Sequence, residues 1–270
     1  MKQIRYFLWI WIVLVGGILA GCQAEPAEAP APEPEPVTGV LYVRPQGALD
    51  NEPSSMSAPA GTTKSNGDET LTYTLEAWSR GRDARCMLHT TATGSMTAGV
   101  QFAVALIPGV YDLLLWADYG NGRYLTSNLR EVTVETEGYA PDARNDAFAC
   151  ALSGVEWNGK ANCNAILKRP LARMSLYSSA AFDRANTVSM TYDEIYTVYD
   201  VLTGEVSAPQ QAISVSFPET VVGSTLVGED FLFVPTDGAF SFSVSVGDVT
   251  QEIDNVPLKP NYSTHITSSF

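Results

Sequence analysis

The side chains that commonly carry catalysis are few and scattered in this sequence. Its 270 residues include two histidines, His89 and His265, and neither has the neighbours that a catalytic or metal-binding role requires. No HExxH, GxSxG, phosphate-binding P-loop or GxGxxG motif occurs. Because no set of acid, base and nucleophile can be named, we expect a protein that is not an enzyme and that uses no cofactor.

Two stretches resemble fragments of metal sites. The spacing of Cys86 and His89 matches half of a zinc pattern, but no second pair accompanies it. On a regular strand these two side chains would point to opposite faces, which argues against joint ligation. The stretch ADYGNGRY, residues 117 to 124, lacks the regular acid spacing and the closing glutamate of a calcium loop. We therefore expect no metal, and a hairpin turn at Asn121.

Tryptophans indicate a different chemistry, the stacking of an indole on a sugar ring. Of the five tryptophans, Trp116 lies in an apolar run that favours packing in the core. Trp157 precedes the turn pair Asn158-Gly159, so an exposed indole is expected there. Trp157 is the candidate glycan contact, and the binding of glycans for nutrient uptake is the alternative function.

The sequence contains four cysteines, at positions 22, 86, 150 and 163. Cys150 and Cys163 flank a short turn-rich segment, so a disulfide that spans a hairpin is one arrangement. Three reduced thiols that pack as small hydrophobic groups, those of Cys86, Cys150 and Cys163, are the other. The sequence leaves both arrangements open.

The N-terminal segment has the layout of a secretory signal peptide. Lys2 and Arg5 precede an apolar run from Tyr6 to Ala20, which is shorter than the roughly 20 residues of a membrane span. Small residues then lead to Cys22, and this end of the run resembles the bacterial lipobox. We predict that residues 1–21 are a lipoprotein signal peptide and that Cys22 carries the lipid, with an ordinary secreted protein as the alternative.

Residues 22–37 consist largely of Ala, Glu and Pro after the cysteine. Such a composition favours an extended polyproline conformation, which at about 3.1 Å per residue would hold a folded domain roughly 40 Å from the bilayer. The acidic stretch loosely resembles surface-export signals of lipoproteins from gut and oral anaerobes. We predict a tether at the cell outer membrane, with the folded part exposed on the cell surface.

The charge of the chain excludes nucleic acid as an expected partner. The formal net charge is −14, and the sequence contains no cluster of Lys and Arg of the kind that neutralises phosphates. The acidity is typical of solvated strand faces that keep a protein soluble.

Alternation of apolar and polar residues predicts an all-β fold. In residues 212–217 and 240–246, Ile, Val and Phe alternate with Ser, as in strands with one buried and one solvated face. The other expected strands are Val40 to Arg44, Leu71 to Trp78, Ala84 to Thr90, Gly99 to Ile107, Val110 to Ala117, Glu131 to Glu135, Ala161 to Leu167, Leu171 to Ser178 and Thr187 to Asp200. The only helical turn expected lies in residues 179–185.

Frequent turn pairs between short strands indicate β-sandwich architecture. The length that remains after the tether is large for one sandwich, so we predict two in series, over residues 38–168 and 169–270. Lys168-Arg169-Pro170 is the expected junction, because a proline stiffens the link and cannot donate to a ladder.

Several stretches resemble consecutive landmarks of a lipoprotein branch within the fimbrillin superfamily. They are GVYDLLLWADYG (Gly109–Gly120), ARNDAFAC (Ala143–Cys150) and LKRPLARMSLYS (Leu167–Ser178). The ending VPLKPNYSTHITSSF, Val256–Phe270, is similar to the last strand of that branch. The resemblance spans roughly residues 38–270, and it implies two tandem transthyretin-like, Greek-key β-sandwiches on a lipid anchor.

The resemblance also implies a mode of assembly. In fimbrillins that build a shaft, a trypsin-like protease cuts after an arginine, the first strand leaves, and a strand of the next subunit fills the groove by β-strand addition. The arginine of the matching region is Arg44, but it precedes Pro45, where such proteases cut poorly. Arg80, Arg82 and Arg85 lie around the end of a candidate strand and suit this role less. No spare strand is evident after the final alternating strand, residues 240–246.

These features predict a non-enzymatic lipoprotein that acts as an accessory, anchor or tip component in fimbrial assembly or adhesion. Its expected partners are the outer membrane through the lipid, fimbrial subunits through strand addition, and a host or glycan ligand. A surface lipoprotein with the same fold and no fimbrial role would share these features, and the sequence does not separate the two.

Overall fold

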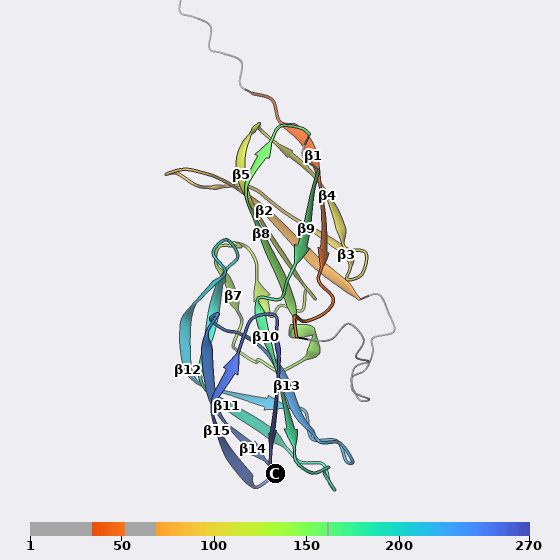
Figure 1. The fold of residues 1–270 in the computed structure, drawn as a ribbon, viewed down its shortest axis with the longest axis vertical. Coiled ribbons are helices and arrows are strands. Elements are labelled where there is room, and N and C mark those ends of the chain that lie inside the picture. Colours follow the sequence, from red (N-terminus) through yellow and green to blue (C-terminus); the bar gives the residue numbers. More distant parts are fainter. Residues whose placement is uncertain (1–33, 52–68, 161) are drawn as a thin grey trace, which may run out of the picture. The chain divides into compact units, whose positions relative to one another are not determined.

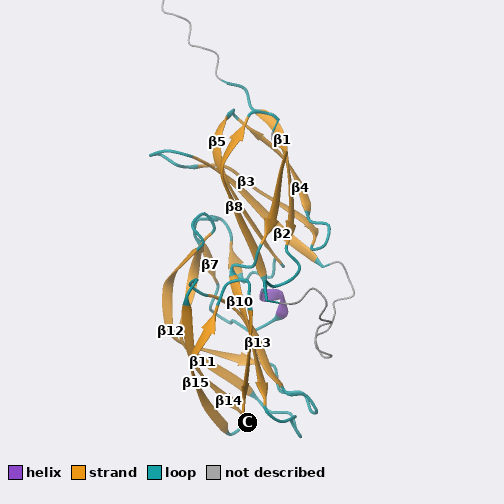
Figure 2. Ribbon diagram, in the orientation of Figure 1, coloured by secondary structure: helices purple, strands orange, loops and turns teal. Residues whose placement is uncertain are grey.

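Strands make up almost all of the regular structure, in agreement with the alternating sequence. The computed structural model describes residues 34–51, 69–160 and 162–270, so the predicted signal peptide, Cys22 and most of the tether lie outside the described residues. The described residues form sixteen strands and one short 3₁₀ helix (Figures 1 and 2). The predicted all-β fold class is confirmed. In this part of the chain, no helix is long and apolar enough to cross a membrane.

The elements have the following bounds: β1 Val37–Pro45, β2 Thr70–Ser79, β3 Cys86–Ser95, β4 Val100–Leu106, β5 Gly109–Asp118, β6 Tyr124–Leu125, β7 Val132–Val134, η1 Ala143–Asn145, β8 Ala147–Trp157, β9 Asn162–Leu167, β10 Leu171–Ser178, β11 Val188–Asp200, β12 Glu205–Phe217, β13 Leu226–Phe233, β14 Gly238–Val246, β15 Val249–Leu258 and β16 Ser263–Ser268.

Two sheets enclose the first hydrophobic core. One has three strands in the order β4-β1-β9, and the other has four in the order β3-β2-β5-β8. Alternate residues of their strands turn inward, including Leu41, Phe102 and Leu167 from the first sheet and Leu75 and Leu113 from the second. This packing is that of a β-sandwich, in which the inner faces of two sheets interdigitate.

A third sheet, of nine strands, forms the second core. Its main order is β15-β14-β11-β13-β10-β16, while β12 and β7 pair with β11, and β6 pairs with β7. The valines and phenylalanines of the alternating β14 point inward with Met174 and Met190. The strict alternation in β14 thus sends its serines outward and its apolar side chains into the core.

A smaller cluster joins the four-stranded and nine-stranded sheets. Trp116 of β5 is fully buried, as predicted, and its ring lies 6.3 Å from that of Phe233 in β13. Arg169, in the predicted junction, is also buried and pairs with Asp146, with 2.8 Å between Nε and Oδ2. Residues Glu35–Phe270 form one compact unit, and the boundary between residues 168 and 169 stays a prediction.

The strands that the alternation did not predict are β8, β13, β15 and β16, together with the short β6; β16 falls within the ending Val256–Phe270 on which the family resemblance rests. In β13 a buried carboxylate, Asp230, interrupts the apolar pattern. In β8, Gly154 has a φ of +69° and lies where the register with β5 shifts. Strand β15 carries Pro257 and few apolar residues. The helical turn expected in residues 179–185 is wrong, because this segment forms bends that connect β10 with β11.

Candidate functional site

The candidate site is the outer face of the three-stranded sheet, which contains Arg44. Strand β1 lies in the middle of this sheet. It pairs antiparallel with β4 over Val37–Val43 and parallel with β9 over Val40–Pro45. Because successive side chains alternate, Leu41 and Val43 enter the core while Tyr42 and Arg44 face outward.

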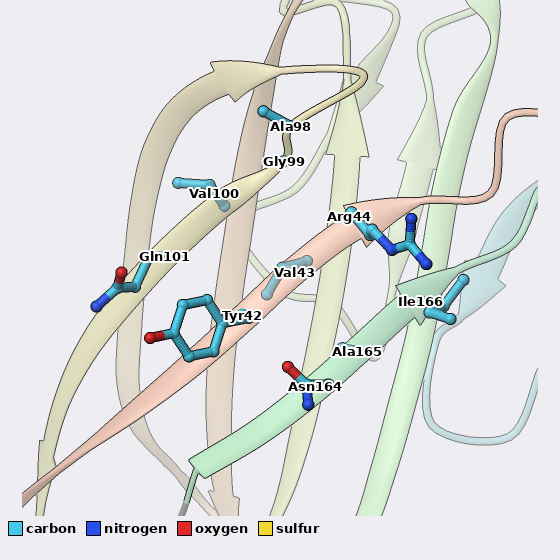
Figure 3. Close-up of a pocket in the computed structure, with 10 residues that line it drawn as sticks. All are labelled: Tyr42, Val43, Arg44, Ala98, Gly99, Val100, Gln101, Asn164, Ala165 and Ile166. Carbon is cyan, nitrogen blue, oxygen red and sulfur yellow. The ribbon is translucent and has the colours of Figure 1, made fainter.

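A hollow of about 530 Å³ lies over this face (Figure 3). Tyr42 stands opposite Gln101 of β4 and Asn164 of β9, and Arg44 stands opposite Ile166. The exposed fractions of Tyr42, in the central strand, and Ile166, in the edge strand β9, are 49% and 52%, which is high for large apolar side chains. The face therefore presents apolar surface beside a single cation.

Gly99 shapes the end of the hollow, in the turn between β3 and β4. Its φ is +73°, and a Cβ built on it would lie 2.0 Å from the carbonyl oxygen of Val43. Its N–H donates to Ser95 O at 2.8 Å, which closes the turn. Only glycine fits here, since any side chain would collide with the backbone of β1.

The Arg44 side chain is exposed, but its peptide bond is not available to a protease. The bond between Arg44 and Pro45 lies within β1, where both residues pair with β9. A protease needs an extended, unpaired segment, so this ladder would have to open first. Two barriers therefore protect the predicted processing site: the proline after the arginine and the sheet around it.

The chemistry available in the hollow is that of binding. Arg44 is the only ionisable group among its lining residues apart from the phenol of Tyr42, and no acid or thiol lines it. No group of three or more His, Cys, Asp or Glu in the described part of the chain could hold a metal. The arrangement suits contact with an extended strand or an apolar surface.

One expectation about Cys86 and His89 is wrong. Cys86 stands opposite Trp78, and His89 stands opposite Glu76, so all four side chains lie on one face of the sheet. The cause is a bulge beside Trp78, which gives β3 one extra residue, Met87. Within the described residues, Cys86 and His89 belong to no group of three or more His, Cys, Asp or Glu that could hold a metal.

Of the two arrangements that the sequence left open for Cys150 and Cys163, the structure has the one without a disulfide. Both are free thiols, as is Cys86. Cys150 lies in β8 opposite Leu115, whereas Cys163 lies in β9 opposite Leu41 in the other sheet. Burial raises the pKa of the Cys150 thiol, which makes it a poor nucleophile at neutral pH.

The expected exposure of Trp157 is also wrong. Its exposed fraction is 1%, and its indole N–H donates to the carbonyl oxygen of Val37 at 2.9 Å. The partner lies far away in the sequence, so the turn pair after Trp157 gave no sign of it. Trp157 seals the first core and offers no surface to a glycan.

Sequence reasoning missed a different tryptophan. Trp78 is partly exposed at the end of β2, and a buried carboxylate, Glu76, accepts its indole N–H at 2.8 Å. The alternation of β2 placed both residues on one face, so an acid two positions before an aromatic residue was the available signal.

Comparisons with known proteins show a family and a fold. A family profile described as "Family of unknown function (DUF6562)" matches residues 41–270. No curated protein matches the chain. Among solved structures, a candidate polysaccharide-binding protein (DUF1812) from Bacteroides thetaiotaomicron is 11% identical to this chain, with a TM-score of 0.53. The match covers 86% of this chain and 91% of that chain.

Two further structures are similar. A candidate adhesin from Bacteroides thetaiotaomicron is 12% identical with a TM-score of 0.51, covering 88% of this chain and 93% of its own. The fimbrial anchor protein Mfa2 from Porphyromonas gingivalis is 13% identical with a TM-score of 0.49, covering 81% of this chain and 80% of its own. The predicted resemblance to fimbrillin-like proteins is confirmed at the level of the fold, and such identities show the fold alone.

Proposed function

Because the chain belongs to DUF6562, a family of unknown function, we propose its role from the fold and the site: a non-enzymatic surface protein of adhesion or fimbrial assembly. Within that role we assign it an accessory position, as an anchor or tip component, rather than a place in a repeating shaft. The names of similar structures, a candidate adhesin and a candidate polysaccharide-binding protein, support the broader role.

The observation that carries the accessory assignment is the Arg44–Pro45 bond, which a proline protects and which lies inside a strand paired on both sides. A shaft subunit must lose its first strand before it can accept a strand from its neighbour. Here β1 pairs on both sides, and Leu41 and Val43 fill the first core. Burial of each such side chain contributes about 2 kcal/mol, so the loss of β1 would leave a sheet split in two and an open core.

A protease assay tests this assignment. The purified chain is incubated with a trypsin-like protease, and the products are identified by mass spectrometry and on a native gel. We expect no cut after Arg44 and no polymer. If the protease cuts early, we expect the cut in the exposed turn that holds Arg80, Arg82 and Arg85. Pro45→Ala removes the chemical barrier and leaves the ladder, so it should stay uncut at Arg44 as well. A regular ladder of polymers would contradict the accessory role.

We also propose that a lipid at Cys22 anchors the protein to the outer membrane, with the folded part outside the cell. The sequence pattern around Cys22 supports this proposal. Mass spectrometry of the native protein should find acyl groups on its sulfur and amine, and Cys22→Ser should move the protein from the membrane to the soluble fraction. Protease shaving of intact cells should degrade the folded part; protection would place it in the periplasm and contradict a role in adhesion.

A further inference from the structure

A second hollow lies away from β1, where the end of β2 meets the hairpin of β11 and β12. Its volume is about 530 Å³, within the range of small-ligand sites. The residues that the argument uses are Trp78 from β2, Asn128 and Arg130 from the turn before β7, and Asp200, Thr203 and Glu205 from the hairpin. Trp78 is the only partly exposed tryptophan in the described part of the chain, since Trp116 and Trp157 are buried.

One buried carboxylate fixes both the ring and the turn. Glu76 is 1% exposed, and its Oε2 accepts the indole N–H of Trp78 at 2.8 Å and the backbone N–H of Leu129 at 3.0 Å. Its Oε1 lies 2.9 Å from Nδ1 of His89. A fully bonded carboxylate holds its donors in place, so the wall formed by Trp78 and the turn is rigid before any ligand arrives.

The turn residues are held in the same way. Oδ1 of Asn128 accepts the N–H of Arg130 at 3.0 Å, and the amide nitrogen of Asn128 has no hydrogen-bond partner among the described residues. The guanidinium carbon of Arg130 lies 5.6 Å from the centre of the Trp78 ring, and its Nη2 lies 3.7 Å from Asp200. Asp200 in turn accepts the N–H of Leu202 at 2.7 Å.

The lining charges exclude several classes of ligand. Three carboxylates, those of Glu131, Asp200 and Glu205, stand against the single cation Arg130, so a polyanion would be repelled. Most of the lining is polar, which disfavours an apolar ligand. A cationic ligand would seek the face of the Trp78 ring, but Arg130 already occupies that position.

We propose that this hollow binds a neutral oligosaccharide. The exposed part of the Trp78 ring that Arg130 does not cover gives apolar contact to the C–H groups of a sugar, and the guanidinium of Arg130 beside it can donate to a hydroxyl group. The amide of Asn128 donates to its hydroxyl groups, while Thr203 and Glu205 supply a hydroxyl and an acceptor from the opposite wall. The inference extends the adhesive part of the proposed function and is independent of strand exchange.

The test uses the full chain and defined probes. Neutral oligosaccharides of glucose, galactose and mannose with four to six units are printed on an array, beside heparin as the anionic probe and hexa-arginine as the cationic probe. Binders are titrated by calorimetry. A bound sugar should also protect the exposed Trp78 from quenching by acrylamide, and Trp78→Phe should abolish that protection.

Two substitutions change the charge of the hollow in opposite directions. If both weaken binding, the cause is the loss of hydrogen bonds to the sugar and not the change of charge. Asn128→Asp keeps the oxygen that accepts from Arg130 but removes the donor and adds a negative charge. Glu205→Ala removes an acceptor and a negative charge. Each should weaken neutral-sugar binding about tenfold. Glu252→Ala, which removes an exposed carboxylate in β15, should leave the affinity unchanged.

Three outcomes would overturn the proposal: no neutral probe binds, a charged probe binds in its place, or a neutral probe binds with equal affinity to all variants. The last result would mean that sugar binds elsewhere on the chain. Thermal unfolding of each variant confirms that it is folded. A negative result leaves the assignment based on β1 untouched, because the protease assay depends on Arg44 and involves none of these residues.

Discussion

Strands β1 and β16 are held in their sheets in different ways, although each runs parallel to a neighbour. The parallel pairing covers six residue pairs in both cases, with β9 beside β1 and β10 beside β16. Strand β1 has a second partner, β4, and buries Leu41 and Val43. Strand β16 lies at the end of its sheet, and none of its residues is fully buried.

This difference indicates which strand the fold can release at low cost. Release of β1 breaks two ladders and opens the first core, whereas release of β16 breaks one ladder and removes side chains that are themselves only partly buried. An edge strand of this kind is where pairing with another chain begins. We therefore expect β1 to behave as a permanent part of the sandwich and β16 as the more labile strand.

The two strands share a support, and its removal gives the largest expected effect. Arg169 lies in the segment that joins β9 to β10, the parallel partners of β1 and β16. It is buried against Asp146, and its backbone N–H donates to the side chain of Asn261, just before β16. Arg169→Ala leaves an unpaired buried carboxylate and should lower the free energy of unfolding by about 3 to 5 kcal/mol in urea titration.

The neighbouring lysine provides the control for this prediction. Lys168 is 61% exposed and lies 3.7 Å from Asp50, so Lys168→Ala should change the free energy of unfolding by less than about 1 kcal/mol. In the double variant of Arg169→Ala and Asp146→Asn, the loss should be smaller than the sum of the single losses. Equal effects of the two alanine substitutions would refute the role of Arg169 as a shared support.

Direct truncation of each strand should produce the next largest difference. Leu41→Ala removes a fully buried side chain of β1 and should lower the free energy of unfolding by about 3 kcal/mol. Ile266→Ala removes a partly buried side chain of β16 and should cost about 1 kcal/mol. Urea midpoints of both variants measure the contrast. A larger loss for Ile266→Ala would reverse the comparison between the two strands.

The backbone contact on β1 is tested by a glycine substitution. Gly99 combines a φ of +73° with a close approach to Val43, so Gly99→Ala should lower the free energy of unfolding by about 2 kcal/mol. Gly47→Ala, in the loop after β1, meets no heavy atom within 4 Å and should be close to neutral. Thermal unfolding of both proteins gives the comparison. Similar melting temperatures would mean that β1 moves away from the turn without cost.

Local pattern was sufficient to predict most of the strands. In β1 and β14 the alternation of apolar and polar residues coincides with the alternation of buried and exposed side chains. Tyr42 and Arg44 could therefore be placed on the outer face from sequence. Their neighbour Ile166 could not, because its position depends on the parallel pairing of β9 with β1, which spans more than a hundred residues.

The wrong expectations have different physical causes. Trp157 is buried against a partner distant in sequence, since Val37 accepts its N–H, whereas Cys86 shares a face with His89 because of a local bulge in the hairpin of β2 and β3. The strand β13 escaped prediction since Asp230 looks like a surface residue. Its partners, Tyr139 and Tyr192, come from a loop and from β11.

Asp230, which lies in the same sheet as β16, makes the stability of the fold depend on pH. It lies in β13, which pairs with β10 on the side opposite β16. Tyr192 donates to its carboxylate at 2.6 Å, Tyr139 donates as well, and the N–H of Phe231 lies 2.8 Å away. Burial raises the pKa of Asp230 to about 7, although the Phe231 N–H and the Arg123 charge oppose that rise.

The sign of the effect follows from proton binding. The ordinary pKa of this carboxyl in an unfolded chain is near 3.8, so between about pH 4 and pH 7 the folded protein binds a proton that the unfolded chain has lost. The stabilisation of the fold by the raised pKa of Asp230 is thus complete below pH 4 and is lost as the pH rises through 7. The loss has a slope of roughly 1 kcal/mol per pH unit.

Urea unfolding of the unaltered chain and of Asp230→Asn across pH 4 to 8 measures this contribution, because all other groups titrate in both proteins. As the pH rises from 4 to 7, the free energy of unfolding of the unaltered chain should fall relative to that of Asp230→Asn. Above pH 7 the difference between the two proteins should become constant. Parallel curves would show that Asp230 stays ionised in the fold. The confirmed slope would mean that the nine-stranded sheet, which holds both Asp230 and β16, contains a group that lowers the stability of the fold toward neutral pH.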